Sequence, residues 1–243
     1  MSGYQATRTY RRPPRSRRRL TTFLIILVVL VGLLVAADFG AKAIAENEVA
    51  SQIQKQGVSQ KPSVSIAGFP FLTQVIRRDI SSMRISWADL PAGPVTFKSI
   101  SAVLNGVHIN SSFNGATVSQ LTGTALITFG ALSNAVSSQV GALGAVGGAG
   151  LTLTDAGPSE IKASLDLVIT SASATWRVTR LSGNRLNIQL VASNGLPSQL
   201  LDSVRNITIP LSGIPLHLQI QSVSITPNGV VGTLTGQNVT FGG

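Results

Sequence analysis

Eighteen consecutive residues without a charged side chain, Leu20–Ala37 (LTTFLIILVVLVGLLVAA), constrain this chain more than any other segment. A helix needs about 20 predominantly apolar residues to cross the hydrocarbon core of a bilayer, so the run is long enough to span a membrane. We therefore predict a transmembrane signal-anchor over residues 20–37.

Basic residues gather directly before this run. Seven arginines lie within residues 1–19, and removing their charges from the formal net charge of +10 leaves +3 for the rest of the chain. Charge confined to a tail does not indicate a nucleic-acid-binding surface. We predict a disordered arm over residues 1–19, which either rests on anionic lipid headgroups or serves only as a topology signal.

The position of the arginines also predicts the topology. Positive charge on the N-terminal side of a span favours a cytoplasmic N-terminus, with the following domain in the periplasm or cell envelope. A cleaved signal peptide is the alternative to a single-pass anchor, because small residues at 35–37 and 41–43 have the spacing of a cleavage site. The apolar run exceeds the ~7–15 residues usual in such a peptide, which favours the anchor.

Residues 38–57 have the pattern of an amphipathic helix that leads into the domain. Ala41, Ala45, Val49 and Ile53 recur every four residues, and Gly57 is placed to end the helix. The helix either continues from the span or begins after it.

The exported domain, residues 58–243, is predicted to be rich in strands. Apolar and polar residues alternate in many short runs, as in Ile161–Thr170, and turn sequences separate these runs. The turn sequences include Pro91–Pro94, Asn105-Gly106, Asn114-Gly115, Gly183-Asn184, Asn194-Gly195 and Pro227–Gly229. Their spacing favours hairpins, and hence antiparallel pairing.

Three segments interrupt the strands. Helical patterns occur around Leu132–Val140 and over Pro197–Val204, and residues 141–150 are apolar and glycine-rich. This last segment lacks the spacing of a phosphate-binding loop. It is predicted to be either a mobile connection or a tip that dips into lipid.

The residue types needed for catalysis are scarce. The chain has no cysteine and two histidines, His108 and His217, which excludes thiol nucleophiles and zinc–thiolate sites. The hydrolase motifs G-x-S-x-G and H-E-x-x-H and the D-x-D motif of nucleotide-sugar transferases do not occur. We therefore predict a protein that is not an enzyme and has no metal or cofactor, and whose apolar strand faces bind an apolar ligand or another protein.

The order of several motifs resembles the LmeA-like family of actinobacterial phospholipid-binding cell-envelope proteins. The anchor and the helix are followed by four segments: V-x-I-x-G-F-P-F-L-T-Q (64–74), L-x-G-V (104–107), ALITFGAL (125–132) and IPLSGIPLHLQIQSVSITPNGV (209–230). The resemblance covers roughly residues 40–241.

The resemblance implies an α+β, mainly β fold of the tubular lipid-binding type, like half of a bactericidal permeability-increasing module. In that fold a strongly curved antiparallel sheet wraps a helix and leaves an apolar groove for acyl chains. It further implies phospholipid as partner, phosphatidylinositol or its mannosides included, and a role beside an envelope glycosyltransferase in lipomannan-type glycolipid biogenesis. The alternatives are a structural adaptor that docks an envelope enzyme and, on pathway association alone, an enzyme acting on envelope glycolipid.

A lipid groove needs apolar walls and a few cations for a phosphate. The predicted wall consists of Phe69, Phe71, Leu72, Ile76, Met83, Ile85, Trp87, Leu165, Leu167, Trp176, Leu218 and Ile220. The predicted headgroup contacts are Arg77, Arg78, Arg84, Arg177, Arg180 and Arg185.

Overall fold

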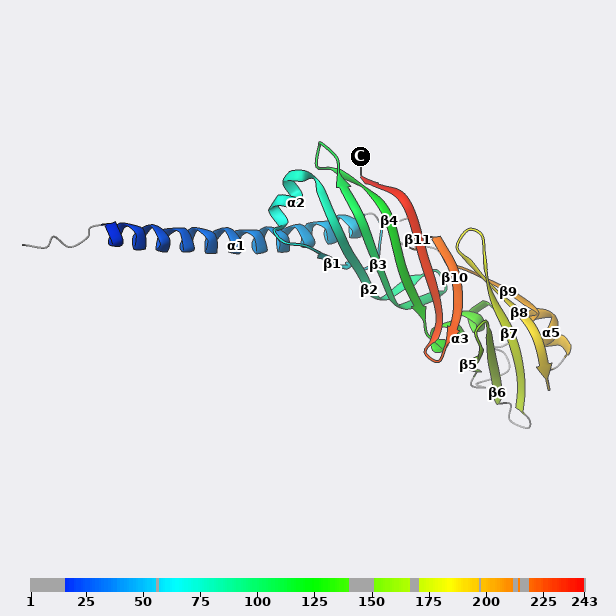
Figure 1. Cartoon of the computed structure of the whole chain (residues 1–243). Coiled ribbons are helices and arrows are strands. Elements are labelled where there is room, and N and C mark those ends of the chain that lie inside the picture. The colour runs from blue at the N-terminus through cyan, green and yellow to red at the C-terminus, as the bar shows by residue number, and fades with distance from the viewer. Residues whose placement is uncertain are drawn as a thin grey trace, which may run out of the picture.

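The structure begins with one long helix. The computed structural model describes residues 16–55, 57–139, 151–166, 171–196, 198–211, 214 and 219–242. Helix α1 (Ser16–Lys55) is continuous over 40 residues, about 60 Å at 1.5 Å per residue. It is long and apolar enough to cross a membrane. The predicted span and the predicted amphipathic helix are thus two parts of one helix, which projects from the strands in Figure 1.

Six strands form the sheet nearer to α1, called sheet A. In spatial order they are β1 (Ser63–Ile66), β2 (Asp79–Ala92), β3 (Val95–Ile109), β4 (Gly115–Ile127), β11 (Gly229–Gly242) and β10 (Gln219–Thr226). All neighbours are antiparallel. Helix α2 (Phe71–Arg77) connects β1 to β2.

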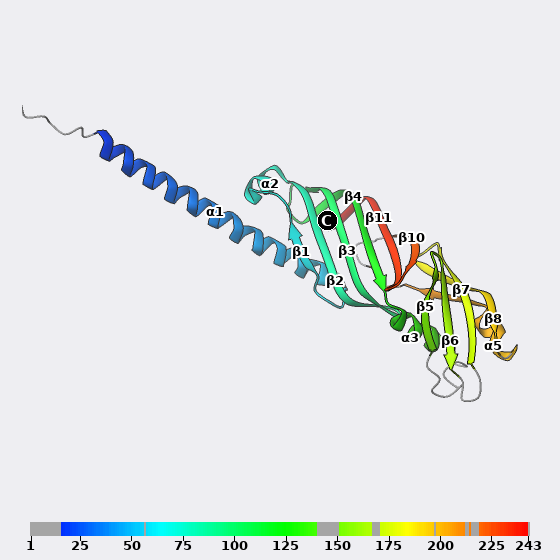
Figure 2. The ribbon, with the colours of Figure 1, turned by 60° about the horizontal axis from the view of Figure 1, so that its bottom comes forward.

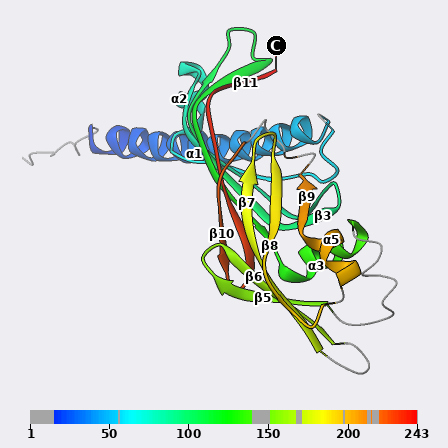
Figure 3. The same ribbon diagram turned by 90° about the vertical axis from the view of Figure 1, so that its right-hand side faces the viewer.

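Sheet B lies at the end of the molecule away from α1 (Figure 2). Its antiparallel order is β5 (Leu151–Gly157), β6 (Glu160–Asp166), β7 (Ser171–Leu181), β8 (Arg185–Asn194) and β9 (Asn206–Pro210). Helices α3 (Phe129–Gln139) and α5 (Ser198–Val204) lie beside β9 in Figure 3 and match the two predicted short helices. The mainly β fold with open antiparallel sheets is confirmed. The wrapping of a curved sheet around the helix stays a prediction.

The alternation of apolar and polar residues explains the long strands of sheet A. Met83, Ile85 and Trp87 of β2 are buried, and each pairs with an apolar residue of β3. The turn predicted at Asn105-Gly106 is wrong, because both residues lie within β3. Gly106 takes a φ of +62° in the strand, and the spacing of buried residues changes there from two to three, Leu104 to Val107. The glycine serves a local irregularity and does not reverse the chain.

One continuous core joins α1 to both sheets. The stripe predicted on the helix faces the domain: Ile53 is buried, while Ala41, Ala45 and Val49 are half-buried against the core. Ala50, which was not part of the predicted stripe, is buried as well. The same cluster continues through sheet A into sheet B. Burying this stripe holds the C-terminal part of α1 against the strands.

Candidate functional site in the apolar interior

The predicted wall residues fall into three groups. Buried in the core are Phe71, Met83, Ile85, Trp87, Trp176 and Ile220. On the surface lie Phe69, Leu72 and Ile76, exposed by 60%, 37% and 79%. Leu165 belongs to β6, whereas Leu167 and Leu218 lie outside the described residues.

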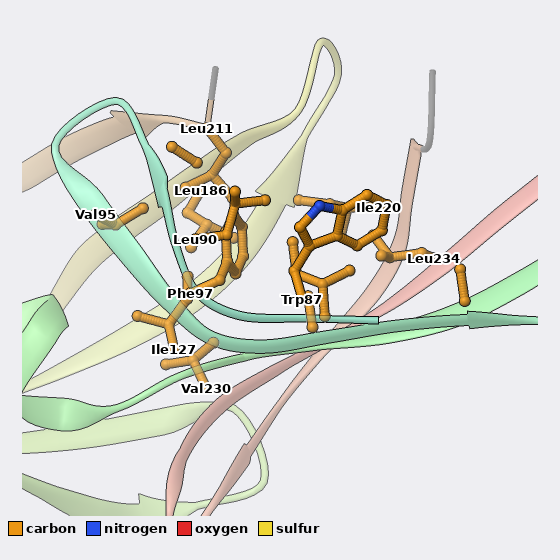
Figure 4. Packing of buried hydrophobic residues seen from close by; sticks show 14 of the residues in the cluster. Trp87, Leu90, Val95, Phe97, Ile127, Leu186, Leu211, Ile220, Val230 and Leu234 are labelled. Carbon is orange, nitrogen blue, oxygen red and sulfur yellow. The ribbon is translucent and has the colours of Figure 1, made fainter. Parts of the chain in front are cut away.

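Side chains from both sheets meet where sheet A passes over sheet B. In Figure 4, Leu90 and Phe97 of the β2–β3 hairpin approach Leu186 and Leu211, while Trp87 lies near Ile220. A narrow gap of about 10 Å³ remains at this seam. The apolar side chains of the two sheets therefore belong to one core, and they pack against each other at the seam.

A larger gap lies under sheet B. Its walls are apolar apart from Ser173, and about 30 Å³ of free volume lies between them. They are formed by Val136, Leu151, Leu153, Ile161, Ala163, Ala172, Ser173, Ala174, Trp176, Ile188, Leu196, Val204 and Ile207. We call this space the sheet B cavity. Its contributors come from the strands, from α3 and from the end of α5.

Small side chains create the cavity. Ala163 of β6 and Ala174 of β7 lie directly opposite each other in the register, and both are buried. Leucine or valine at these positions would fill the space, as Val178 does farther along β7. The alternation in the sequence placed Ala163 on the apolar face. The cavity itself arises because the side chains of Ala163 and Ala174 are short.

Trp176 forms one side of the cavity and is held by a hydrogen bond. Its indole Nε1–H donates to the carbonyl oxygen of Val204 over 2.9 Å. A buried indole usually needs such a partner, because an unpaired N–H in the interior costs free energy. The bond ties β7 to the end of α5 across the cavity.

The six predicted arginines do not form one cluster. Arg77 and Arg78 lie at the end of α2, and Arg84 on β2, all beside sheet A. Arg177, Arg180 and Arg185 are on β7 and β8 of sheet B, the sheet that lies farther from α1 (Figure 1). The Arg177 guanidinium pairs with Glu160 at 2.8 Å, and the Arg185 Nε–H donates to the Ser182 carbonyl oxygen.

Two carboxylates of α1, which the sequence analysis did not single out, hold the segment that carries β1 and α2. The Asp38 oxygens accept hydrogen bonds from the backbone N–H groups of Phe71 and Leu72, at 2.8 and 2.7 Å. Glu46 accepts one from the N–H of Ile66 over 2.7 Å. Asp38 is 4% exposed, although it directly follows the apolar run. The signal available in the sequence was an acidic residue directly after the apolar run, because a carboxylate placed among apolar residues requires hydrogen-bond donors.

Metal-ligating side chains do not gather in the described part of the chain. It contains no group of three or more His, Cys, Asp or Glu residues that could hold a metal ion. His108 lies on β3 opposite Asp79 of β2, and His217 is outside the described residues. The features that stand out are the continuous apolar interior and its cavity.

Comparison with known proteins agrees with this geometry. Residues 36–235 match the family model described as LmeA-like phospholipid-binding. No curated protein and no solved structure matches the chain. The match begins within α1, includes all of sheet B and ends within β11. The chain therefore belongs to the LmeA-like phospholipid-binding family.

Proposed function

We propose that this chain is a non-catalytic phospholipid-binding protein, anchored by α1 with its domain outside the cytoplasmic membrane, that holds acyl chains in the sheet B cavity. The observation that carries the proposal is the apolar cavity lined with alanines in a chain of this family. We further propose phosphatidylinositol or its mannosides as the lipid. The protein would thereby support lipomannan-type glycolipid biogenesis beside an envelope glycosyltransferase.

Lipid entry requires the cavity to widen. A free volume of about 30 Å³ does not hold an acyl chain, so the chain must displace side chains such as Val136 and Val204 from sheet B. Relative to water, burying a CH₂ group contributes about 0.8 kcal/mol, so ten such groups hold a bound chain against release into water by about 8 kcal/mol. The interior has few polar groups to desolvate, which keeps the opposing cost low.

Uptake of labelled lipid tests the proposal. The full chain is stripped of lipid in detergent and offered fluorescent phosphatidylinositol, with phosphatidylcholine as the comparison. We expect saturable uptake accompanied by a change in Trp176 emission, because this indole lines the cavity. Absence of uptake for both lipids would contradict the proposal.

The headgroup contact is tested by two matched double substitutions. Arg180 and Arg185 lie where β7 and β8 approach the seam, since the intervening turn residue Asn184 accepts a hydrogen bond from the Ile220 N–H. We expect Arg180→Gln with Arg185→Gln to weaken phosphatidylinositol uptake about tenfold, equivalent to ~1.4 kcal/mol. Arg77→Gln with Arg78→Gln should leave uptake into the cavity unchanged. Equal effects of the two pairs would contradict this assignment.

The adaptor remains a second candidate, and the small size of the cavity favours it. A core this closely packed needs no ligand to be stable. An adaptor would take up no phospholipid, and cross-linking in cells would recover one dominant envelope enzyme. The uptake measurement therefore decides between the two functions.

A further inference from the structure

Four large apolar side chains are exposed together where α1 and α2 meet. Phe39 and Phe69 are 58% and 60% exposed, and their rings stack with centroids 5.9 Å apart. Leu72 and Ile76 are separated by one turn of α2 and are also exposed. We call these four residues the α2 patch. They lie on the surface and have no part in the sheet B cavity.

Hydrogen bonds to Asp38 fix the position of the α2 patch along α1. Asp38 is the first residue after the uncharged run Leu20–Ala37, and it accepts hydrogen bonds from the first two backbone amides of α2. Helix α2 therefore begins at the level where α1 leaves its apolar segment. Figures 1 and 2 show α2 as the part of the domain nearest to the N-terminal half of α1.

Two arginines, Arg77 and Arg78, lie beside the apolar side chains of the α2 patch. Arg77 is in the last turn of α2, and Arg78 follows it in a left-handed conformation with a φ of +56°. The Arg78 guanidinium lies 5.6 Å from the ring centre of Phe113, which is itself 58% exposed at the tip of the β3–β4 hairpin. Exposed aromatic and aliphatic side chains next to arginine are typical of segments that lie at the interface of a bilayer.

We propose that the α2 patch docks onto the surface of the phospholipid bilayer that α1 crosses. This inference rests on the proposed anchoring of α1. Phe69, Leu72 and Ile76 enter the interfacial region, and Arg77 and Arg78 contact lipid phosphates. The domain is then held at a fixed tilt on the membrane. A partner protein is a poorer fit, because a stable protein interface buries about 1,200–2,000 Å² in total, more than four side chains supply. A bilayer crossed by the apolar segment of α1 would have its surface at the level of the patch.

Spin labels at single cysteines test the docking, since the native chain has no cysteine. The full chain is placed in nanodiscs of phosphatidylcholine and phosphatidylglycerol, with one label at Ile76→Cys, Ser222→Cys or Val28→Cys. Ser222 is exposed on β10 and serves as the control in water, and Val28 lies within the apolar run as the control in lipid. Collision rates with oxygen, which concentrates in lipid, and with a nickel chelate, which stays in water, are compared.

We expect the label at Ile76→Cys to collide with the nickel chelate several-fold less often than the label at Ser222→Cys. Adding Phe69→Ser and Leu72→Ser should restore these collisions at Ile76→Cys. A label at Ile76→Cys as accessible to nickel as that at Ser222→Cys would overturn the docking, and the proposed anchoring would stand if Val28→Cys remains in lipid. Val28→Cys in water would overturn the anchoring and the docking together. Low accessibility to both reagents with spin–spin broadening would mean that a second copy covers the patch, which also overturns the proposal.

Discussion

Replacing Ala174 with phenylalanine is expected to abolish phospholipid binding while both sheets remain folded. The new ring points into the sheet B cavity, whose free volume of about 30 Å³ lies directly beside this alanine. Overpacking of this kind typically costs ~1–3 kcal/mol, less than the loss of a core side chain. Bound lipid is counted by mass spectrometry after purification of the full chain.

Two further variants make this result interpretable. Ala174→Leu adds less volume and should reduce bound lipid without abolishing it, which keeps the test informative should the phenylalanine variant unfold. Thr179→Phe adds the same ring to the exposed side of β7 and should leave binding unchanged. Emission from Trp87 in sheet A and from Trp176 in sheet B reports folding of each sheet. Undiminished binding by a folded Ala174→Phe variant would mean that lipid lies elsewhere.

Removing the Asp38 carboxylate is expected to detach α2 from α1. Asp38→Ala removes the carboxylate that accepts hydrogen bonds from the backbone N–H groups of Phe71 and Leu72. Both N–H groups lose this acceptor. Each such bond contributes about 1.5–3 kcal/mol, so we expect a local loss of ~3–6 kcal/mol. Hydrogen exchange at the amides of α2 should accelerate strongly, whereas the strands of sheet B keep their protection.

The matched variants separate a lost cap from a general effect on the helix. Asp38→Asn keeps one oxygen acceptor and should show an intermediate exchange rate. Glu48→Ala removes an exposed carboxylate of α1 that accepts a hydrogen bond from Gln52 of the same helix, and exchange in α2 should stay at the native rate. Native exchange in Asp38→Ala would show that packing of Phe71 alone holds α2 in place.

Elements with a strong local signal were predictable from the sequence. The apolar run and the four-residue stripe predicted α1, because both patterns depend only on neighbours along the chain. Hairpin turns such as Gly93-Pro94 and Gly183-Asn184 were found for the same reason. The turn predicted at Asn105-Gly106 was wrong, because a glycine with positive φ occurs both in turns and in irregular strands.

Burial within the predicted wall could not be predicted from residue type. Phe69, Phe71, Leu72 and Ile76 are all apolar, yet Phe71 alone of the four is buried. Which of them is covered depends on how α2 lies on α1 and β2, and that orientation is set by Asp38, 33 residues from Phe71 in sequence. The arginines pose the same problem, because their two clusters in sequence lie in different parts of the fold.

The cavity was the least visible feature. Alternation predicted an apolar face on β6, but a cavity arises where two short side chains meet across strands, here Ala163 and Ala174. That pairing depends on the register of β6 with β7, which a single sequence specifies only through its turn and its buried face. Alanine gives no signal that distinguishes a filled position from an open one.

Phospholipid binding in the interior under sheet B is the main property proposed for this chain. Its most direct test is mass spectrometry of the lipids that co-purify with the full native chain, side by side with Ala174→Phe and Thr179→Phe. We predict bound phospholipid, enriched in phosphatidylinositol or its mannosides, on the native chain and on Thr179→Phe, and its loss from Ala174→Phe. A native chain that carries no phospholipid, or a folded Ala174→Phe variant that carries as much as the native chain, would contradict the claim.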